Sequence, residues 1–387
     1  MRYLLFRMKR FCGFSVGFVF FISGILKLMD PVGSSLVMQA YFKFFHIGFL
    51  DFTAKPLAMV LALTESVIGA GLVTGVWRKA LAPIAVGLQI FFTIITLFLL
   101  IFNPEMDCGC FGEAIHLTHG ETFTKNIVLL TLLLIYYIPA KYLGQTKKKK
   151  YISFAIVTAS TLMFTIYSYN RLPLYDFTAY HVGADLKVSG NKETPIYDAL
   201  FIYEKNGIQE TFTIENIPDS TWSFVRTETI SDTEKEDKAA TLSFYNEAGE
   251  YADSIVLHGK VLIISVYNSN ISVSQKNKIR TLTKIAEEQG ITPIILTSFH
   301  TKDFEDGFNH YSSDRKTLMT LNRSNGGATL LEDGVIVQKW AKKSLPDTEE
   351  LTKILEEDVT ETIIGNSGNS IAFQGFMLYV FAVMLLL

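Results

Sequence analysis

The stretch "LAPIAVGLQIFFTIITLFLLIF" (81–102) is a long, mostly apolar run without a charged residue. A helix needs about 20 apolar residues to cross the hydrocarbon core of a bilayer, which is about 30 Å thick. Four further runs of this kind occur in the first half of the chain: "FCGFSVGFVFFISGILKLM" (11–29), "PLAMVLALTESVIGAGLVTGVW" (56–77), "NIVLLTLLLIYYIPAKYL" (126–143) and "YISFAIVTASTLMFTIYSY" (151–169). The sequence therefore predicts an α-helical membrane bundle of five spans.

The charge distribution divides the chain into two parts with different surroundings. Of its 387 residues, 49% are hydrophobic and 19% charged, which favours a membrane protein. Residues 1–170 carry 15 Lys and Arg against 7 Asp and Glu, whereas residues 171–387 carry 20 against 31. No small-x-small cleavage site follows the first run, so we expect that run to be retained rather than removed as a signal peptide.

The basic residues of the first half predict the orientation in the membrane. With the N-terminus in the cytoplasm, eleven basic residues lie on the inner side: Arg2, Arg7, Lys9, Arg10, Arg78, Lys79, Lys141 and Lys147–Lys150. Lys43, Lys55 and Lys125 then lie outside, in agreement with the positive-inside rule. We therefore expect the loop 103–125 and the chain from 171 to about 370 to face outward, which in a bacterial inner membrane is the oxidising periplasm.

The outward loop "NPEMDCGCFGEAIHLTHG" (103–120) holds two of the three cysteines, Cys108 and Cys110. Disulfide geometry requires Cα atoms about 4.4–6.8 Å apart, which a Cys-x-Cys reaches only with a bent backbone. Gly109 supplies that freedom, and Gly112 adds a second permissive point. Asp107 and Phe111 complete the motif "DCGCFG". Cys12 lies at the opposite end of the first span, about 30 Å of bilayer away, and is a poor partner.

Three interpretations of this loop stay open. Cys108 and Cys110 form a redox-active catalytic dithiol, since strained and exposed disulfides are often the labile ones. Alternatively, they form a structural disulfide that fixes the loop. The third possibility is a metal site of Cys108, Cys110, His116 and His119, although C-x-C departs from the usual C-x(2–4)-C spacing of zinc ligands.

Three polar residues within the predicted spans are candidates for a site, because ionisable groups in a bilayer are costly. Lys27 lies one turn from the outer end of the first span, and its simplest role is to snorkel to the headgroups. Glu65 lies in the middle of the second span, where it needs Lys27 as a partner or a polar cavity shared with Gln89. A proton site of a transporter is a further role for Glu65. Gly71 and Gly75 have the small-xxx-small spacing of a helix-packing face.

These residues resemble a known family. The segment "FISGILKLMDP", a Glu followed by spaced glycines, and "DCGCFG" are similar to the DoxX/MauE group of four-helix membrane proteins, over residues 11–143. The resemblance implies a role like that of MauE, which is associated with methylamine utilisation and the maturation of a disulfide-rich periplasmic subunit. It also implies thiosulfate or quinone oxidoreduction, as in DoxX relatives, with a bilayer quinone as the cofactor to consider. It implicates Cys108, Cys110, Lys27 and Glu65.

The second half predicts an α/β domain outside the membrane. A hairpin around Asn206-Gly207 precedes the charged stretch "TETISDTEKEDKAA". Then come a buried strand "KVLIISVY", the helix "SQKNKIRTLTKIAEEQG", a second strand "ITPIILTS", a hairpin across Asp333-Gly334 and the helix "DTEELTKILEED". This β-α-β…β-β-α order resembles thioredoxin. The Cys-x-x-Cys is missing, and Gly326 and Gly327 stand where that fold usually keeps a cis-proline.

Because no cysteine follows Cys110, this domain cannot itself exchange disulfides, and whether the whole chain is an enzyme, a membrane oxidoreductase, stays open. We expect it to bind a periplasmic protein client, with the lipid bilayer as the other partner and no nucleic acid. A non-enzymatic scaffold presenting a recognition domain is the alternative function. The sequence divides into 1–145 (four-helix domain), 146–170 (fifth span), 171–240 (linker and hairpin), 241–365 (thioredoxin-like domain) and 366–387 (a possible sixth span, or a helix lying against the bundle).

Overall fold

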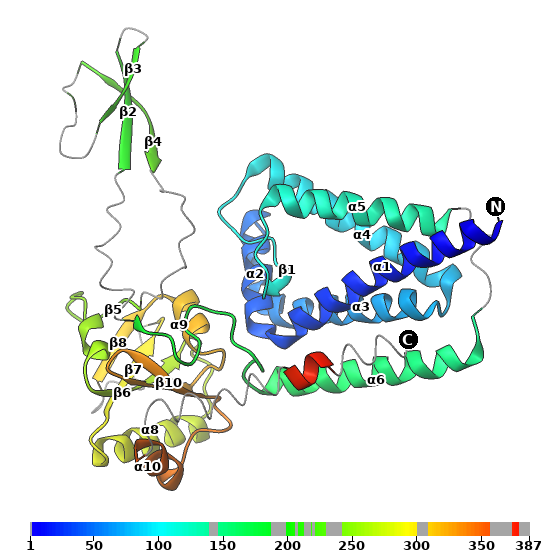
Figure 1. Cartoon of the computed structure of the whole chain (residues 1–387). Helices are drawn as coiled ribbons and strands as arrows, with labels where there is room; N and C mark the ends of the chain where they lie inside the picture. The colour runs from blue at the N-terminus through cyan, green and yellow to red at the C-terminus, as the bar shows by residue number, and fades with distance from the viewer. Residues whose placement is uncertain are drawn as a thin grey trace.

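A computed structural model describes residues 2–138, 146–186, 199–205, 208–212, 218, 221–229, 242–299, 309–356 and 374–378. Figure 1 shows a domain of long helices running side by side, with a sheet domain next to one of its ends. A smaller sheet of three strands stands apart from both. The division into a helical half and a sheet half follows the change in composition near residue 170.

The helical domain contains all five predicted apolar runs as helices, over the residues that the structure describes. Its elements are α1 (Arg2–Met29), α2 (Pro31–Phe44), η1 (Gly48–Thr53), α3 (Ala54–Thr74), α4 (Arg78–Phe102), β1 (Cys110–Glu113), α5 (His119–Tyr137) and α6 (Lys148–Asn170). Four segments are long and apolar enough to cross a membrane: Phe6–Met29, Gly48–Thr74, Arg78–Phe102 and Lys148–Asn170.

Helix α5 differs from the predicted fourth run because it begins in polar sequence, at His119. The Thr118 hydroxyl accepts a hydrogen bond from the backbone N–H of Glu121 at 3.3 Å, and Glu121 accepts one from the N–H of Thr118 at 3.0 Å. This capping box starts the helix two turns before the apolar residues. The first two turns of α5 are polar. Over its described residues, α5 is therefore not among the four segments that are long and apolar enough to cross a membrane. Residues 139–143 of the predicted run lie outside the described residues.

Helix α2 was not predicted from the sequence. The Asp30 carboxylate caps it by accepting hydrogen bonds from the N–H groups of Val32 at 3.2 Å and Gly33 at 2.9 Å. Pro31 occupies the first helical position, where its missing N–H costs nothing. The letters "DPVG" are therefore a helix-start signal that could have revealed α2.

Helices α1 and α3 approach until their backbones touch. A Cβ added at Gly24 would lie 2.5 Å from the Ala62 carbonyl oxygen, and one at Gly17 would lie 2.7 Å from the Gly69 carbonyl oxygen. Of the two glycines predicted to form a packing face, only Gly71 packs against other helices. Gly71 lies against the side chain of Leu81, and Gly75 is the left-handed residue that ends α3, with φ 71°.

The sheet domain is built on a six-stranded sheet in the order β10-β9-β6-β7-β8-β5. Its strands are β5 (Phe244–Tyr245), β6 (Lys260–Val266), β7 (Thr292–Thr297), β8 (Asn309–Ser313), β9 (Gly327–Glu332) and β10 (Val335–Trp340). The helices are η4 (Asp253–Leu257), α8 (Val273–Glu288), α9 (Arg315–Leu321) and α10 (Thr348–Glu356). β6 and β7 are parallel through the crossover helix α8, and β9 and β10 form an antiparallel hairpin across Asp333-Gly334.

This domain also takes in residues that the sequence assigns to a linker. Tyr180, Ala184 and Leu186 are buried in the core beneath the sheet, and Asp185 forms a β-bridge with Val335. The prediction of a linker from residue 171 onward therefore fails for these residues. The aromatic and small residues of this segment show neither a helical nor a strand period in hydrophobicity, so the sequence could not indicate this packing.

The predicted hairpin around Asn206-Gly207 is present. Strands β2 (Ala199–Lys205) and β3 (Ile208–Phe212) pair antiparallel, and β4 (Ser223–Thr229) adds to β2 on its other edge. β4 takes up the start of the charged stretch predicted as a loop, and residues 230–240 of that stretch lie outside the described residues. At the C-terminal end, the ring of Phe376 stacks on Phe164 of α6 at 4.5 Å. The predicted sixth span falls mostly outside the described residues.

We predict that Gly24→Ala destabilises the helical domain, because the added methyl group would meet the backbone of α3. Overpacking of this kind costs about 1–3 kcal/mol. The measurement is the melting temperature in detergent, with Gly87→Ala in α4 as the matched control, since a Cβ there meets nothing within 4 Å. Equal melting temperatures for the two variants would contradict this account of the α1–α3 contact.

Candidate functional site

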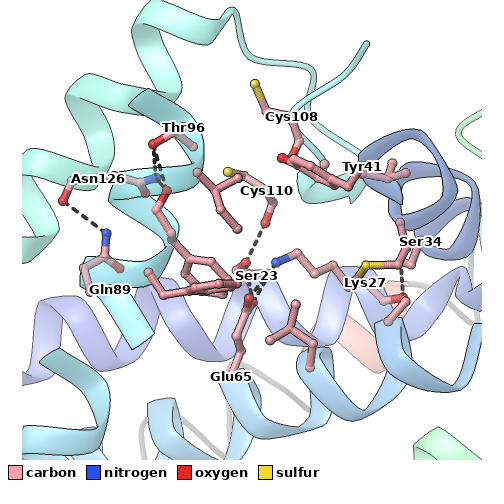
Figure 2. Close-up of a pocket in the computed structure, with 18 of the residues that line it drawn as sticks. Ser23, Lys27, Ser34, Tyr41, Glu65, Gln89, Thr96, Cys108, Cys110 and Asn126 are labelled. Carbon is pink, nitrogen blue, oxygen red and sulfur yellow. Dashed lines mark hydrogen bonds and ion pairs between the residues drawn. The ribbon is translucent and has the colours of Figure 1, made fainter. Parts of the chain in front are cut away.

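A cavity of about 560 Å³ lies within the helical domain, at the end that carries the CGC loop. Figure 2 shows polar side chains from several helices pointing into it, with the loop bearing Cys108 and Cys110 on one side. Most of the remaining wall is apolar, including Phe91, Phe92 and Phe98 of α4. This combination of a large apolar wall and a few convergent polar groups is typical of a small-molecule site.

Lys27 and Glu65 form the charged centre of the cavity. The Lys27 Nζ atom lies 2.8 Å from both carboxylate oxygens of Glu65, which is almost fully buried at 2% exposure. Lys27 therefore turns inward to its partner, and the snorkelling role does not apply. Two opposite charges in a low-dielectric interior neutralise each other, which makes both tolerable between α1 and α3.

Ser23 connects this ion pair to the cysteine loop. Its hydroxyl oxygen lies 3.0 Å from Glu65 Oε2 and 2.6 Å from the Cys110 carbonyl oxygen. On the other side, the Tyr41 hydroxyl of α2 donates to the Cys108 carbonyl at 2.9 Å. Both cysteines are thus held by their backbone carbonyls. Sequence reasoning missed Ser23, although it lies one helical turn before Lys27 on the same face of α1.

A second polar chain lies across the cavity between α4 and α5. Gln89 donates to the Asn126 carbonyl at 3.1 Å, and the Asn126 side-chain amide donates to the Thr96 hydroxyl at 3.1 Å. The sequence singled out Gln89 but not its partners. Asn126 stands directly before the apolar run "IVLLTLLLIYY". A polar residue at the start of such a run is the feature by which the sequence could have indicated it.

The CGC loop has the bent backbone that its glycines predict. Gly109 and Gly112 have φ values of 61° and 62°, a region that favours glycine, and a Cβ at Gly109 would collide with Val37. Phe111 lies beneath the Lys125 ammonium group, 4.8 Å from its ring centre. The two cysteines are free thiols, and Figure 2 shows their sulfur atoms pointing apart.

The two histidines of the loop contact different partners. His119 Nδ1 lies 3.2 Å from Cys108 Sγ, whereas His116 Nδ1 lies 3.3 Å from an Asp107 carboxylate oxygen. No group of three or more His, Cys, Asp or Glu side chains within the described parts of the chain is placed to hold a metal ion. The predicted four-ligand set is therefore not assembled here.

The two thiols differ in their surroundings. Cys108 is 6% exposed, and burial raises the pKa of its thiol above the ordinary value, an effect that the nearby Thr122 hydroxyl only partly offsets. Cys110 is half-buried. Cys12 is buried on α1 among residues of α3, α4 and α5 and takes no part in the cavity.

A buried arginine of the sheet domain contacts the same end of the helical domain. Arg323, which follows α9 and is 6% exposed, places Nη2 at 2.8 Å from Asp30 Oδ2 and at 3.3 Å from Glu113 Oε1. Asp30 caps α2, and Glu113 ends the strand that begins at Cys110. A Cβ at Gly33 would lie 2.8 Å from Glu113 Cγ, so glycine is needed for this close approach.

A second ion pair supports the same contact. Lys339 of β10 lies 2.8 Å from Asp176, in the segment that joins α6 to the sheet domain. Burial by itself would raise the pKa of Asp176, but the Lys339 ammonium and Arg323 outweigh it, so that this pKa lies below its ordinary value. None of the five charged residues of these two contacts was singled out in the sequence, because the partners of each pair are far apart along the chain.

We predict that Lys27→Met destabilises the protein strongly, because it leaves Glu65 charged and buried without a partner. Breaking a buried pair in this way costs about 3–5 kcal/mol. The double variant Lys27→Met/Glu65→Gln removes both charges and should recover part of the lost melting temperature. If Glu65→Gln lowers the melting temperature by the same amount in the Lys27→Met background as in the unchanged protein, the two residues do not interact.

We predict that Arg323→Met loosens the contact between the two domains, because Asp30 and Glu113 then lose their shared cation. Hydrogen exchange should increase in α2 and β1, while the core strands of the sheet keep their protection. The matched control is Arg315→Met, which changes an exposed arginine at the start of α9. Unchanged exchange in α2 and β1 would show that Arg323 does not hold the domains together.

Comparison with known families matches two parts of the chain. Residues 4–139 match the family model described as methylamine utilisation protein MauE. Residues 197–232, which cover the three-stranded sheet, match a domain of unknown function. Neither a curated protein nor a solved structure matches the chain. The match covers the helical domain, with its cavity, its Lys27–Glu65 pair and its CGC loop, which is thus similar to the MauE family over about a third of the chain.

Proposed function

We propose that the protein is a membrane thiol–disulfide redox factor that matures a protein client outside the cytoplasm. The observation that carries this proposal is the position of the cysteines. Cys108 and Cys110 line the same cavity as the Lys27–Glu65 pair, and their backbone carbonyls are fixed by Tyr41 and Ser23. A dithiol held at the rim of an apolar cavity can exchange with a client on one side and with a small oxidant on the other.

The redox step requires an acceptor of two electrons and two protons. When Cys108 and Cys110 form a disulfide, both S–H bonds break, one S–S bond forms, and two electrons and two protons leave. A bilayer quinone can take up both as it is reduced to a quinol. The cavity residues fit such a molecule, because Lys27 and Gln89 provide N–H groups for carbonyl oxygens and the Phe91 and Phe98 wall accommodates apolar atoms.

The orientation of the proposed factor follows from its basic residues. Arg10, Arg78 and Lys147 each act electrostatically on Lys150. Helices α1 and α6, which carry Arg10 and Lys150, begin at an end of the bundle away from β1 and the CGC loop (Figure 1). With this end in the cytoplasm of a bacterium, the cysteines and the sheet domain face the periplasm, where disulfides persist. That placement keeps the thiols away from cytosolic reductants.

The sheet domain has the role of holding the client. Its elements β6, α8, β7, β9, β10 and α10, with β8 and α9 inserted between β7 and β9, support a thioredoxin-like fold. Its lack of cysteine assigns all disulfide chemistry to the loop. Arg323 places this domain next to β1, the strand that begins with Cys110. A client bound there would have its own cysteines near the site of exchange.

The test is to trap the client. We expect Cys108→Ser or Cys110→Ser to abolish oxidation of the client and one of these variants to accumulate a mixed disulfide that mass spectrometry identifies. Cys12→Ser is the matched control and should leave activity unchanged, because Cys12 lies outside the cavity. If both loop variants retain full client oxidation, the redox proposal is wrong.

A non-enzymatic scaffold is the second candidate, favoured by the absence of cysteine from the sheet domain. In that case the CGC bond only fixes the loop beside Glu113. The reduction potential separates the two candidates, since structural disulfides lie below about −300 mV and exchangeable ones lie higher.

A further inference from the structure

We propose that His119 is the general base that removes the proton from the Cys108 thiol. This inference rests on the proposed redox function and names a catalytic residue for it. The evidence is the contact between His119 Nδ1 and Cys108 Sγ, at 3.2 Å, in a loop whose other histidine points elsewhere.

The second ring nitrogen of His119 sets the protonation state that a base requires. Nε2 lies 3.0 Å from the Pro104 carbonyl oxygen. A carbonyl can only accept, so Nε2 carries the hydrogen and donates it. In the neutral ring Nδ1 is then the nitrogen with the free lone pair, and it faces Cys108. The backbone therefore selects the tautomer in which His119 can accept the thiol proton.

The elements on both sides of the loop hold this pair in place. Pro104 follows Asn103, the residue that caps the C-terminal end of α4, and His119 is the first residue of α5, fixed by the Thr118–Glu121 capping box. The Tyr41 hydroxyl holds the carbonyl of Cys108 itself. The base and the thiol are thus aligned before any client binds.

The proton transfer is balanced within the pair. The Sγ–H bond breaks, its electron pair stays on sulfur as a thiolate, and a new Nδ1–H bond forms on a ring that becomes an imidazolium. The N-terminal end of α5 also favours an anion at this position. Burial raises the pKa of the isolated thiol, which is why a neighbouring base is needed for reaction near neutral pH.

Several charged groups act on the same sulfur, and a pH profile must take account of them. Asp107 and Cys110 disfavour the thiolate, whereas Lys125 favours it. His116 is half-exposed and paired with Asp107, so it does not reach the thiol. It therefore provides a matched control for a histidine substitution in the same loop.

The experiment measures alkylation of Cys108 by iodoacetamide in the full chain carrying Cys12→Ser and Cys110→Ser, from pH 5.5 to 9. General bases contribute about 10²–10⁴-fold to the reactions they assist. We expect His119→Gln, which keeps a hydrogen-bond donor for Pro104 but provides no base, to slow alkylation at pH 7 by about tenfold or more. The profile should move to higher pH, and His116→Gln should leave it unchanged.

Alkylation in denaturant must be equal for all variants, which confirms that the effect requires the folded loop. If His119→Gln does not fold, His119→Asn carries the same test, because it too removes the base. An unchanged profile in the folded variant overturns the proposal.

The outcome is separate from that of the client experiment. If His119→Gln slows alkylation but the cysteine variants still oxidise the client, the proposal that His119 is a base stands and the redox function is wrong. If alkylation is unchanged in His119→Gln but client oxidation requires the cysteines, only the proposed role of His119 is wrong.

Discussion

The structure depends on the ion pair between Lys27 and Glu65. A charge in the middle of a bilayer is costly, and the pair is tolerated because each group neutralises the other. Their closeness requires α1 and α3 to lie in backbone contact, which the glycines between the two helices permit. The Ser23 hydroxyl lies within hydrogen-bond distance of both Glu65 and the carbonyl of Cys110, and so places the cysteine loop beside this pair. Helix packing, cavity and cysteine loop are thus parts of one arrangement.

Sequence reasoning found the parts of this site that break a pattern. Lys27, Glu65 and Gln89 interrupt apolar runs, and Cys108 and Cys110 are two of only three cysteines, so each was visible without a structure. The glycines of the loop were equally evident, because a bent backbone needs them. The strands and helices of the sheet domain followed from hydrophobic period and turn residues, as in the hairpin at Asp333-Gly334.

What could not be predicted are contacts between segments far apart along the chain. Tyr41 contacts Cys108 from α2, a helix that was not predicted and that begins at the Asp30 cap. Arg323 lies in a loop of ordinary composition, and only the fold brings it to Asp30 and Glu113. His119 was considered as a metal ligand, because sequence spacing cannot say which ring nitrogen faces which neighbour. Tertiary geometry decided all three cases.

Strand β1 has a consequence for communication between the two domains. It contains only four residues and begins with a cysteine and ends with the carboxylate that Arg323 binds. Gly109 joins the two cysteines, and a change of the backbone there would pass through so short a strand to its far end. Under the proposed redox function, a change in the oxidation state of the loop would then reach the contact between Glu113 and Arg323 and alter how firmly the sheet domain is bound to the helical domain.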